Sequence, residues 1–280
     1  MTTGRQRVVE AASELLGPTE VLADRSWPHA ESVVLELWSG GRHVIGKAYR
    51  QQAKFANERF VYEHWVPAIA ERAPALRGAD PAGQVLLFSH VHGRPAAEVA
   101  PLSPALHHRA GALLARFHGA AAPVALDGYL DGLRRRLGDW LDRARPGVLT
   151  DVDVDTVRRW LDQAGDLPDP TGVPCHRDWQ PRNWLDAGDG DPWAIDFEHA
   201  RVAPWFEDVQ RLSWQEWRVA PAAADAFFDG YGRSLDGIDR RWLDVTAALW
   251  HLTSIVWADE HGDAALVAEG RARLGSMAVQ

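Results

Sequence analysis

The chain has 280 residues, 46% hydrophobic and 25% charged, which is typical of a globular protein with one large or two small domains. Its net charge of −9 excludes the basic surface of a nonspecific nucleic-acid binder, so no nucleic-acid partner is expected. A single cysteine, Cys175, excludes an intramolecular disulfide, and without a signal core or membrane-length apolar run we expect a cytoplasmic protein with no membrane partner.

The N-terminal third of the chain predicts two helices and four strands. The first helix covers residues 8–16, where apolar residues recur at helical spacing, and it ends at Gly17-Pro18. The second helix is expected over residues 52–70, with an apolar stripe on one side. Short β-branched and apolar runs between turn residues predict the strands, over residues 20–24, 33–38, 42–49 and 85–88.

The rest of the chain, after an expected hinge at Gly93, predicts helices. Ser103-Pro104 is typical of an N-cap followed by proline in the first turn, and it starts a helix that reaches Phe117. Further helices are expected over residues 130–141, 154–163, 205–217, 222–231, 240–260 and 264–274. Residues 165–174 are the only linker-like stretch. We therefore expect an α+β, two-lobed molecule, with a small antiparallel-sheet lobe at residues 1–91 and a larger helical lobe at residues 92–280.

Two short motifs in the second half carry the chemistry. Asp178 stands two residues after His176, Asn183 five residues after Asp178, and Asp196 thirteen residues after Asn183. A catalytic carboxylate, an amide metal ligand and a second metal carboxylate are the parts that phosphoryl transfer needs, and the protein kinase motifs have the same order. We expect Asp178 to act as catalytic base or to orient the acceptor hydroxyl, and Asn183 and Asp196 to bind Mg²⁺.

The segment between the two motifs predicts a β-hairpin. Residues 184–185 and 192–195 are short apolar runs, and every residue of 186–191 favours a turn. The hairpin brings its ends together, so Asn183 and Asp196 are expected to flank one metal site. The alternative is a hairpin whose polar residues simply face solvent, which the joint spacing disfavours.

Lys47, on the third strand, is the candidate for contacting the α- and β-phosphates of a nucleotide. Such a lysine needs a carboxylate to hold it, and we expect Glu58 on the next helix, with Glu63 as second choice. Taken alone, a lysine on a strand is usually a solvated surface residue. It gains weight here from the motifs downstream.

At these motifs the chain resembles the aminoglycoside phosphotransferase and choline kinase superfamily, small-molecule relatives of the protein kinases. The histidine-x-aspartate-x4-asparagine loop at residues 176–183 and the isoleucine-aspartate-aromatic run at residues 195–197 carry the resemblance. It implies a protein-kinase-like fold, ATP or GTP as phosphate donor, Mg²⁺ and a small-molecule hydroxyl acceptor. It also implies structural roles for His176 and for Asp208, which would brace the catalytic loop.

The same resemblance implies the nucleotide contacts. Residues 86–95 look like the family's hinge, where backbone groups would bind the purine. The hinge residues expected to do so are Ser89, His90 and Val91. No glycine-rich loop lies between the first two strands, and Ser26 and backbone amides near His29 would contact the phosphates instead.

Two residues depart from the family's common pattern. Arg177 stands where glycine is most common. Glu198, two residues after Asp196, forms an aspartate-x-glutamate pair that resembles choline and methylthioribose kinases, in which both carboxylates can serve the metal. Glu198 is therefore a candidate metal ligand, and the alternative is an ion pair with an arginine such as Arg201.

We expect an ATP- or GTP-dependent O-phosphotransferase that moves the γ-phosphate to a hydroxyl of a small molecule, such as an aminoglycoside, nucleoside or peptide antibiotic, as a resistance or self-protection enzyme. The resemblance implies that the acceptor binds mainly to the C-terminal helices. These helices carry several tryptophans and the carboxylates of Asp259 and Glu260. A choline- or methylthioribose-type metabolic kinase is the first alternative. An inactive nucleotide-binding module is disfavoured because Lys47, Asp178 and both metal-ligand candidates are retained. A protein kinase is disfavoured because the glycine-rich loop and an Ala-Pro-Glu segment are missing. The acceptor, the choice between ATP and GTP, and the oligomeric state stay open.

Overall fold

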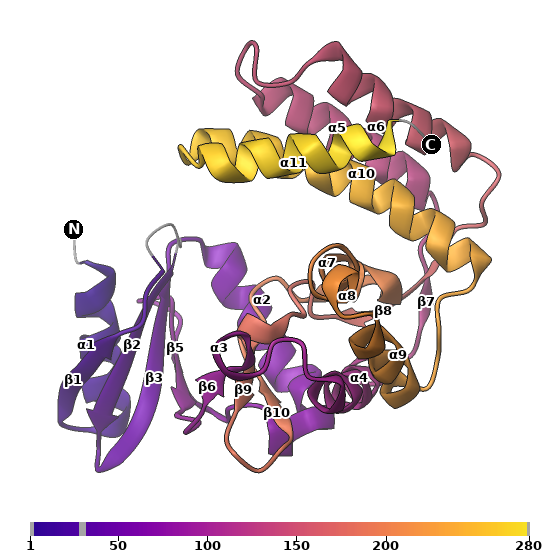
Figure 1. Ribbon diagram of the computed structural model, residues 1–280. Coiled ribbons are helices and arrows are strands. Elements are labelled where there is room, and N and C mark those ends of the chain that lie inside the picture. The colour runs from indigo at the N-terminus through magenta and orange to yellow at the C-terminus, as the bar shows by residue number, and fades with distance from the viewer. Residues whose placement is uncertain (1–2, 28–31, 279–280) are drawn as a thin grey trace. The chain divides into compact units, whose positions relative to one another are not determined.

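The computed structural model describes residues 3–27 and 32–278 (Figure 1). The chain folds into two compact units, each assembled from two separate stretches. The first unit comprises Met1–Ala122 and Val173–Ser234, and the second comprises Pro123–Gly172 and Leu235–Gln280. The molecule mixes helices with antiparallel strands, as the sequence predicts, and the lobe boundary expected between residues 91 and 92 stays a prediction.

A five-stranded antiparallel sheet forms the N-terminal part of the first unit (Figure 1). Its strands, in spatial order, are β1 (Thr19–Asp24), β2 (Ser32–Ser39), β3 (Arg42–Tyr49), β5 (Val85–Ser89) and β4 (Leu76–Asp80). The sequence predicts all of them except β4. That edge strand contains Gly78 and its pairing is irregular between Leu76 and Gly78, so it has neither the alternation nor the β-branched residues of a typical strand.

Helix α1 (Gly4–Leu16) packs against this sheet and forms part of its core. It starts with a capping box between Thr3 and Gln6 and ends at Gly17, whose φ of 105° suits glycine. Val8 of the helix is fully buried against strand residues, and a Cβ at Gly46 would lie 2.4 Å from its Cγ1. Glycine at this strand position thus lets α1 approach β3, the strand that carries Lys47.

The helix expected over residues 52–70 is shorter and ends in a different conformation. Helix α2 (Gln52–His64) stops before Trp65, and a 3₁₀ segment, η1 (Val66–Arg72), follows. Pro67 explains the break, because proline lacks the amide hydrogen of an α-helical bond and disfavours helical geometry in the residue before it. Tertiary packing still buries Ile69 completely, so the apolar stripe serves the core in both segments.

The remainder of the first unit holds the catalytic-loop region. Its helices include α3 (Ala96–Val99), α4 (Pro104–His118) and α9 (Pro221–Tyr231), and a small sheet is formed by β6 (Arg94–Pro95), β9 (Trp184–Asp186) and β10 (Pro192–Ala194). The predicted hairpin is present, with Ala194 opposite Trp184.

The prediction of a single helix over residues 205–217 is wrong. The structure has three short helical segments there: η3 (Trp205–Asp208), α7 (Gln210–Trp214) and α8 (Glu216–Val219). Gln215 has φ and ψ of −113° and −88°, which interrupts the helix between the last two pieces.

The second unit is mainly helical. Its helices are α5 (Tyr129–Arg143), α6 (Asp151–Gln163), α10 (Gly237–Glu260) and α11 (Ala264–Met277). The stretch expected to be a linker contains a strand instead: Thr171 and Gly172, the start of β8 (Thr171–Cys175), pair with β7 (Val124–Ala125). Among the described residues, none of the helices is long and apolar enough to span a lipid bilayer.

Candidate active site

Lys47 lies at the centre of a buried charge cluster in the first unit. Its ammonium nitrogen is 2.8 Å from Glu58 Oε2, 2.6 Å from Asp196 Oδ1 and 3.0 Å from Glu198 Oε2. Burial alone would lower the pKa of Lys47, but the surrounding carboxylates, led by Asp196 and Glu58, raise it well above its ordinary value. Lys47 is therefore a permanent cation that joins β3, α2 and the Asp196 segment.

Glu58 is fully engaged as the support of this lysine. Its Oε2 accepts hydrogen bonds from Lys47 and from the Tyr49 hydroxyl at 2.6 Å, and its Oε1 accepts one from the Phe197 amide at 3.1 Å. Burial raises the pKa of Glu58 above its ordinary value, and the charge of Lys47 opposes that shift. The structure pairs Lys47 with Glu58 as expected, whereas Glu63, the second choice, forms an ion pair with Arg59.

Asp178 is held by four donors. Arg182 and Arg211 contact its carboxylate at 2.7 and 2.9 Å, Asn183 Nδ2 donates at 2.8 Å, and Gln180 Nε2 donates to Oδ1. Burial would raise the pKa of Asp178, but Arg211 and Arg182 outweigh it and hold that pKa below its ordinary value. The side chain is thus a fixed carboxylate of which 11% stays exposed.

Asp208 supports the backbone of the catalytic loop through hydrogen bonds. This buried carboxylate accepts the amide hydrogens of His176, at 2.7 Å, and of Arg177, and it also contacts His118 Nε2 at 2.9 Å. His176 lies completely inside, where its Nε2 donates to the Ile195 carbonyl at 2.9 Å and its Nδ1 accepts from the Asp178 amide. Both residues therefore have the structural contacts that the sequence led us to expect.

Two residues of the site have a left-handed backbone. Arg177 has a φ of 69° and Asp196 a φ of 67°, a region that favours glycine. The conformation explains why glycine suits position 177, and here the arginine side chain offsets the strain through a buried ion pair with Glu207. At Asp196 the same geometry turns the carboxylate toward Lys47.

Asp196, Glu198 and Glu58 form a set of oxygen ligands, since one carboxylate oxygen from each lies within 4.8 Å of the others. Glu198 also contacts Lys54 at 3.1 Å and His199 at 3.2 Å. Burial opposes the shift, but the hydrogen bond from His199 and the charge of Lys47 hold the pKa of Glu198 far below its ordinary value. Glu198 thus forms ion pairs with Lys47 and Lys54, whereas the expected alternative named an arginine such as Arg201, and its role as a metal ligand stays a prediction.

Asn183 is oriented with its amide oxygen away from Asp178. Its Nδ2 donates to both the backbone oxygen and the Oδ2 of Asp178, at 2.8 Å each, so Oδ1 is left for another partner. The backbone oxygen of Asn183 accepts the Ile195 amide at 3.1 Å, which ties it to the residue before Asp196. The hairpin thus brings the two metal-ligand candidates to neighbouring positions, as predicted.

The expected purine contacts differ among the hinge residues. The amides of Ser89 and His90 already donate to the carbonyls of Ala75 and His43, at 2.8 and 3.2 Å. Within the described part of the chain, Val91 has its backbone N–H and C=O free of hydrogen bonds. Val91 is therefore the member of the three best placed to bind a purine through its backbone.

Ser26, expected to contact the nucleotide phosphates between β1 and β2, already forms hydrogen bonds within the sheet. The Ser26 hydroxyl accepts the Val34 amide at 3.0 Å, and the Ser26 amide donates to Asp24 Oδ1 at 2.9 Å, so this residue mainly closes the strand end. The expectation for amides near His29 lies outside the described residues.

Three further residues complete the site, and sequence reasoning missed them. Arg182 follows Asp178 by one helical turn's spacing and its charge was a usable signal. Asn57 holds the segment after Asp196, donating to the carbonyls of Glu198 at 3.1 Å and Ala200 at 2.9 Å. Arg211 comes from α7, thirty-three positions from Asp178, and no local pattern connects the two.

A model of the phosphotransferase enzyme family matches residues 36–268, a range that contains Lys47, the catalytic loop and Asp196. The chain belongs to the phosphotransferase enzyme family. It is accordingly a small-molecule phosphotransferase, and the predicted superfamily is confirmed. No curated protein matches the chain.

Solved structures of this kind share the fold at low sequence identity. Aminoglycoside phosphotransferase APH(4)-Ia, in a ternary complex with ADP and hygromycin B, has a TM-score of 0.74 and 15% identity, with 97% of both chains covered. A choline/ethanolamine kinase family protein from Mesorhizobium loti has a TM-score of 0.68 and 22% sequence identity. The match covers 99% of this chain and 95% of that one. Macrolide 2'-phosphotransferase from Brachybacterium faecium has a TM-score of 0.63 and 18% sequence identity. The match covers 95% of this chain and 97% of that one. The protein-kinase-like α+β fold is thus confirmed.

Proposed function

We propose that this enzyme transfers the γ-phosphate of ATP or GTP to a hydroxyl of a small molecule, with Asp178 facing the acceptor and Lys47 the donor phosphates. One observation carries the proposal: Asp178, Asn183, Asp196 and Lys47 form a continuous chain of contacts. Asn183 bonds Asp178, its backbone bonds Ile195, and the next residue, Asp196, bonds Lys47. Phosphoryl transfer depends mainly on such positioning and on charge neutralisation.

Lys47 would neutralise phosphate oxygens of the bound nucleotide. It is a buried cation among three carboxylates, so its charge is fixed and its position is set by Glu58. Tyr49 and the Phe197 amide keep Glu58 in place. Val91 would supply backbone hydrogen bonds to the purine, and Ser89 and His90 would shape the same hinge.

The residues present fit a Mg²⁺ ion. Asn183 Oδ1, the outer oxygen of the half-exposed Asp196 carboxylate and Glu198 are hard oxygen ligands, the kind that Mg²⁺ prefers. When bound, the ion would neutralise phosphate charge. Both carboxylate oxygens of Glu58 already accept hydrogen bonds, from Lys47, Tyr49 and the Phe197 amide. We therefore assign the metal to Asn183, Asp196 and Glu198.

Asp178 would orient the acceptor hydroxyl and accept its proton late in the transfer. Efficient general bases have a pKa near the working pH, whereas Arg211 and Arg182 keep the pKa of Asp178 low. A low pKa guarantees the ionised carboxylate that must accept a hydrogen bond from the hydroxyl. Positioning is thus the larger part of its role.

For the acceptor we propose an antibiotic with an accessible hydroxyl, modified in the cytoplasm as a resistance or self-protection reaction. Support comes from similar structures described as aminoglycoside and macrolide phosphotransferases. Asp259 and Glu260 form ion pairs with Arg145 and Arg143, so they are less suited to hold an amino sugar than their sequence suggests. A choline- or methylthioribose-type acceptor is the second candidate, favoured by the position of Glu198 in the metal cluster.

The test is turnover of ATP and GTP, each with Mg²⁺, against aminoglycosides, macrolides, nucleoside and cyclic peptide antibiotics, choline and methylthioribose. We expect acceptor-dependent turnover that falls by about 10²- to 10⁴-fold in Asp178→Asn, while nucleotide binding persists. Asp189→Asn is the matched control, since Asp189 is an exposed loop aspartate paired with Arg72, and it should keep wild-type turnover. Equal turnover in wild type and Asp178→Asn, or no nucleotide binding by the wild type, would contradict the proposal.

A further inference from the structure

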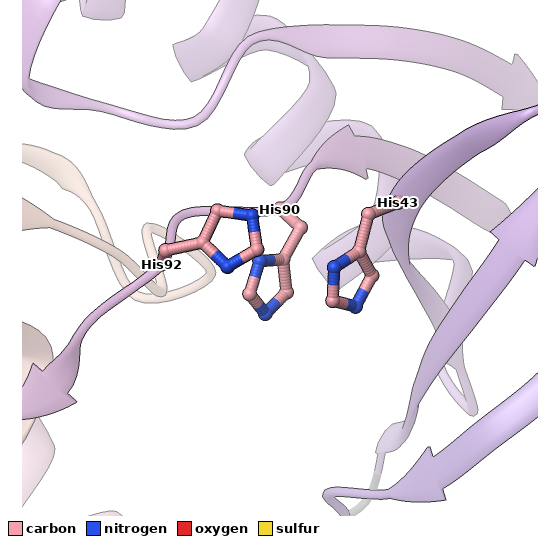
Figure 2. Close-up of side chains that lie close together, drawn as sticks. All are labelled: His43, His90 and His92. Carbon is pink, nitrogen blue, oxygen red and sulfur yellow. The ribbon is translucent and has the colours of Figure 1, made fainter.

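Three histidines gather at the end of the N-terminal sheet, away from the carboxylate cluster. His43 lies at the start of β3, and His90 and His92 lie in the segment after β5 (Figure 2). The rings of His43 and His90 are stacked at 3.7 Å, and His92 meets them edge-on at 5.3 and 4.6 Å. His43 is four strand positions from Lys47, which is about 13 Å along β3.

The ring nitrogens are close enough to share one ion. One nitrogen from each ring lies within 4.8 Å of the others. Two nitrogens bound to one tetrahedral Zn²⁺ at about 2.0–2.1 Å are separated by roughly 3.3 Å, so each ring needs to move by only about 1 Å. The parallel rings of His43 and His90 cannot both point at one ion, and one must turn about its soft terminal torsion.

Two features distinguish this cluster from a chance stack of rings. The Nδ1 atom of His90 is buried without a hydrogen-bond partner, which is costly unless another group binds it. Glu36 Oε1 lies 2.7 Å from Nε2 of His43, the arrangement in which a carboxylate orients a metal-bound histidine and leaves Nδ1 for the ion. His92 is exposed and gives the site an entrance from solvent.

We propose that His43, His90 and His92 bind one transition-metal ion of the Zn²⁺ class, with Glu36 orienting His43. Three imidazoles suit Zn²⁺, Ni²⁺ or Cu²⁺ and do not suit Mg²⁺, which prefers oxygen ligands. The site is therefore chemically distinct from the Asn183, Asp196 and Glu198 site of the proposed phosphotransferase. A fourth position is open to water. Because His90 belongs to the hinge, an ion here would stiffen the segment that borders the purine.

The test uses the tag-free full chain, without Mg²⁺ and nucleotide, titrated with Co²⁺ and followed by visible absorption. We expect one bound ion with the visible bands of four-coordinate Co²⁺, displaced by Zn²⁺. His92→Gln and His43→Gln should each weaken binding by at least about 100-fold, and Glu36→Gln by roughly 10- to 100-fold. Zn²⁺ should raise the melting temperature of the wild type and leave that of His92→Gln unchanged.

Two control variants separate this site from other metal-binding groups. His64→Gln removes an exposed histidine whose ring stacks on Phe60, and Asp196→Asn disables the carboxylate cluster. Both should keep wild-type Co²⁺ affinity and bands. Absence of the four-coordinate bands in the wild type, or a loss in His64→Gln as large as in His92→Gln, would overturn the proposal. Neither readout depends on turnover, so the result is independent of the proposed reaction.

Discussion

Asp178 shows how single residues adjust the chemistry of a shared fold. Two arginines, a glutamine and an asparagine donate hydrogen bonds to its carboxylate. Burial alone would favour the protonated acid, and the two positive charges reverse that preference. In the proposed reaction, a carboxylate already held rigid and ionised would orient the acceptor hydroxyl with little reorganisation.

Arg177 offers a test of strain against charge. Replacing it by glycine relieves a left-handed backbone worth about 1 kcal/mol, but removes the ion pair that Arg177 forms with Glu207, of which 8% is exposed. We expect Arg177→Gly to lose a net 1–3 kcal/mol or so of unfolding free energy in urea. The double variant Arg177→Gly with Glu207→Gln should recover most of the loss. A single variant more stable than wild type would show that strain dominates.

Lys47 can be tested against its neighbour. Lys47→Met should raise the KM for nucleotide by roughly 10- to 100-fold, because a charge-assisted contact to phosphate is lost. Glu58→Gln keeps an oxygen for Tyr49 and Lys47 and should have a smaller effect. Lys54→Met is the comparison, since Lys54 contacts Glu198 but is partly exposed. Similar KM values for Lys47→Met and Lys54→Met would speak against a phosphate role for Lys47.

At the scale of elements, the contact between α4 and α9 positions the brace of the catalytic loop. A Cβ at Gly230 would lie 1.9 Å from the His108 carbonyl oxygen, and one at Gly111 would lie 2.2 Å from that of Phe227. The two helices touch through these glycines. This contact places the Tyr231 hydroxyl 2.7 Å from His118 Nδ1. The other ring nitrogen of His118, Nε2, contacts the Asp208 carboxylate.

Gly230→Ala should force α4 and α9 apart and lower the unfolding free energy by about 1–3 kcal/mol, because backbone atoms cannot yield as a flexible side chain can. Gly138→Ala on α5 is the matched control, since nothing lies within 4 Å of its added methyl group. That control should gain about 0.5–1 kcal/mol from helix propensity. Urea unfolding of both variants measures the difference, and a loss of the same size in Gly138→Ala would refute the packing argument.

For the whole molecule, stability against acid depends on groups buried in their neutral form. His251 on α10 is completely buried, and burial, followed by the charge of Arg273, lowers its pKa to about 3. A histidine that must lose its proton on folding stabilises the protein above its unfolded pKa of about 6.5, and that contribution disappears as the pH falls toward 3.

The wild type should accordingly lose roughly 2 kcal/mol from this group between pH 7 and pH 5, at about 1.4 kcal/mol per pH unit below 6.5. His251→Gln has no proton to bind there, so its free energy of unfolding should fall less over the same range. Urea unfolding at both pH values gives the two slopes, and His64→Gln, which removes an exposed histidine, should keep the wild-type slope. Identical slopes in wild type and His251→Gln would show that His251 is not buried neutral.

Local sequence patterns were sufficient for most elements and for the motifs that carry the family resemblance. Helix spacing, caps and turn residues predict α1, α4 and the hairpin of β9 and β10, because each depends on neighbours a few residues away. The spacing of Asp178, Asn183 and Asp196 is likewise a local signal, and their catalytic and metal-binding roles stay predictions. Patterns fail where a local preference is weak, as at the edge strand β4, or where an unusual backbone conformation interrupts a helix, as at Gln215.

The sequence by itself determined the family and the order of the motifs, while the roles of the motif residues in phosphoryl transfer stay predictions. Only the tertiary structure decided that Arg211 reaches Asp178 and that His43 meets His90. These contacts join residues between thirty and fifty positions apart. Periodicity and turn chemistry act over a few residues, whereas burial, orphaned polar atoms and shared charges exist only after distant elements have packed together.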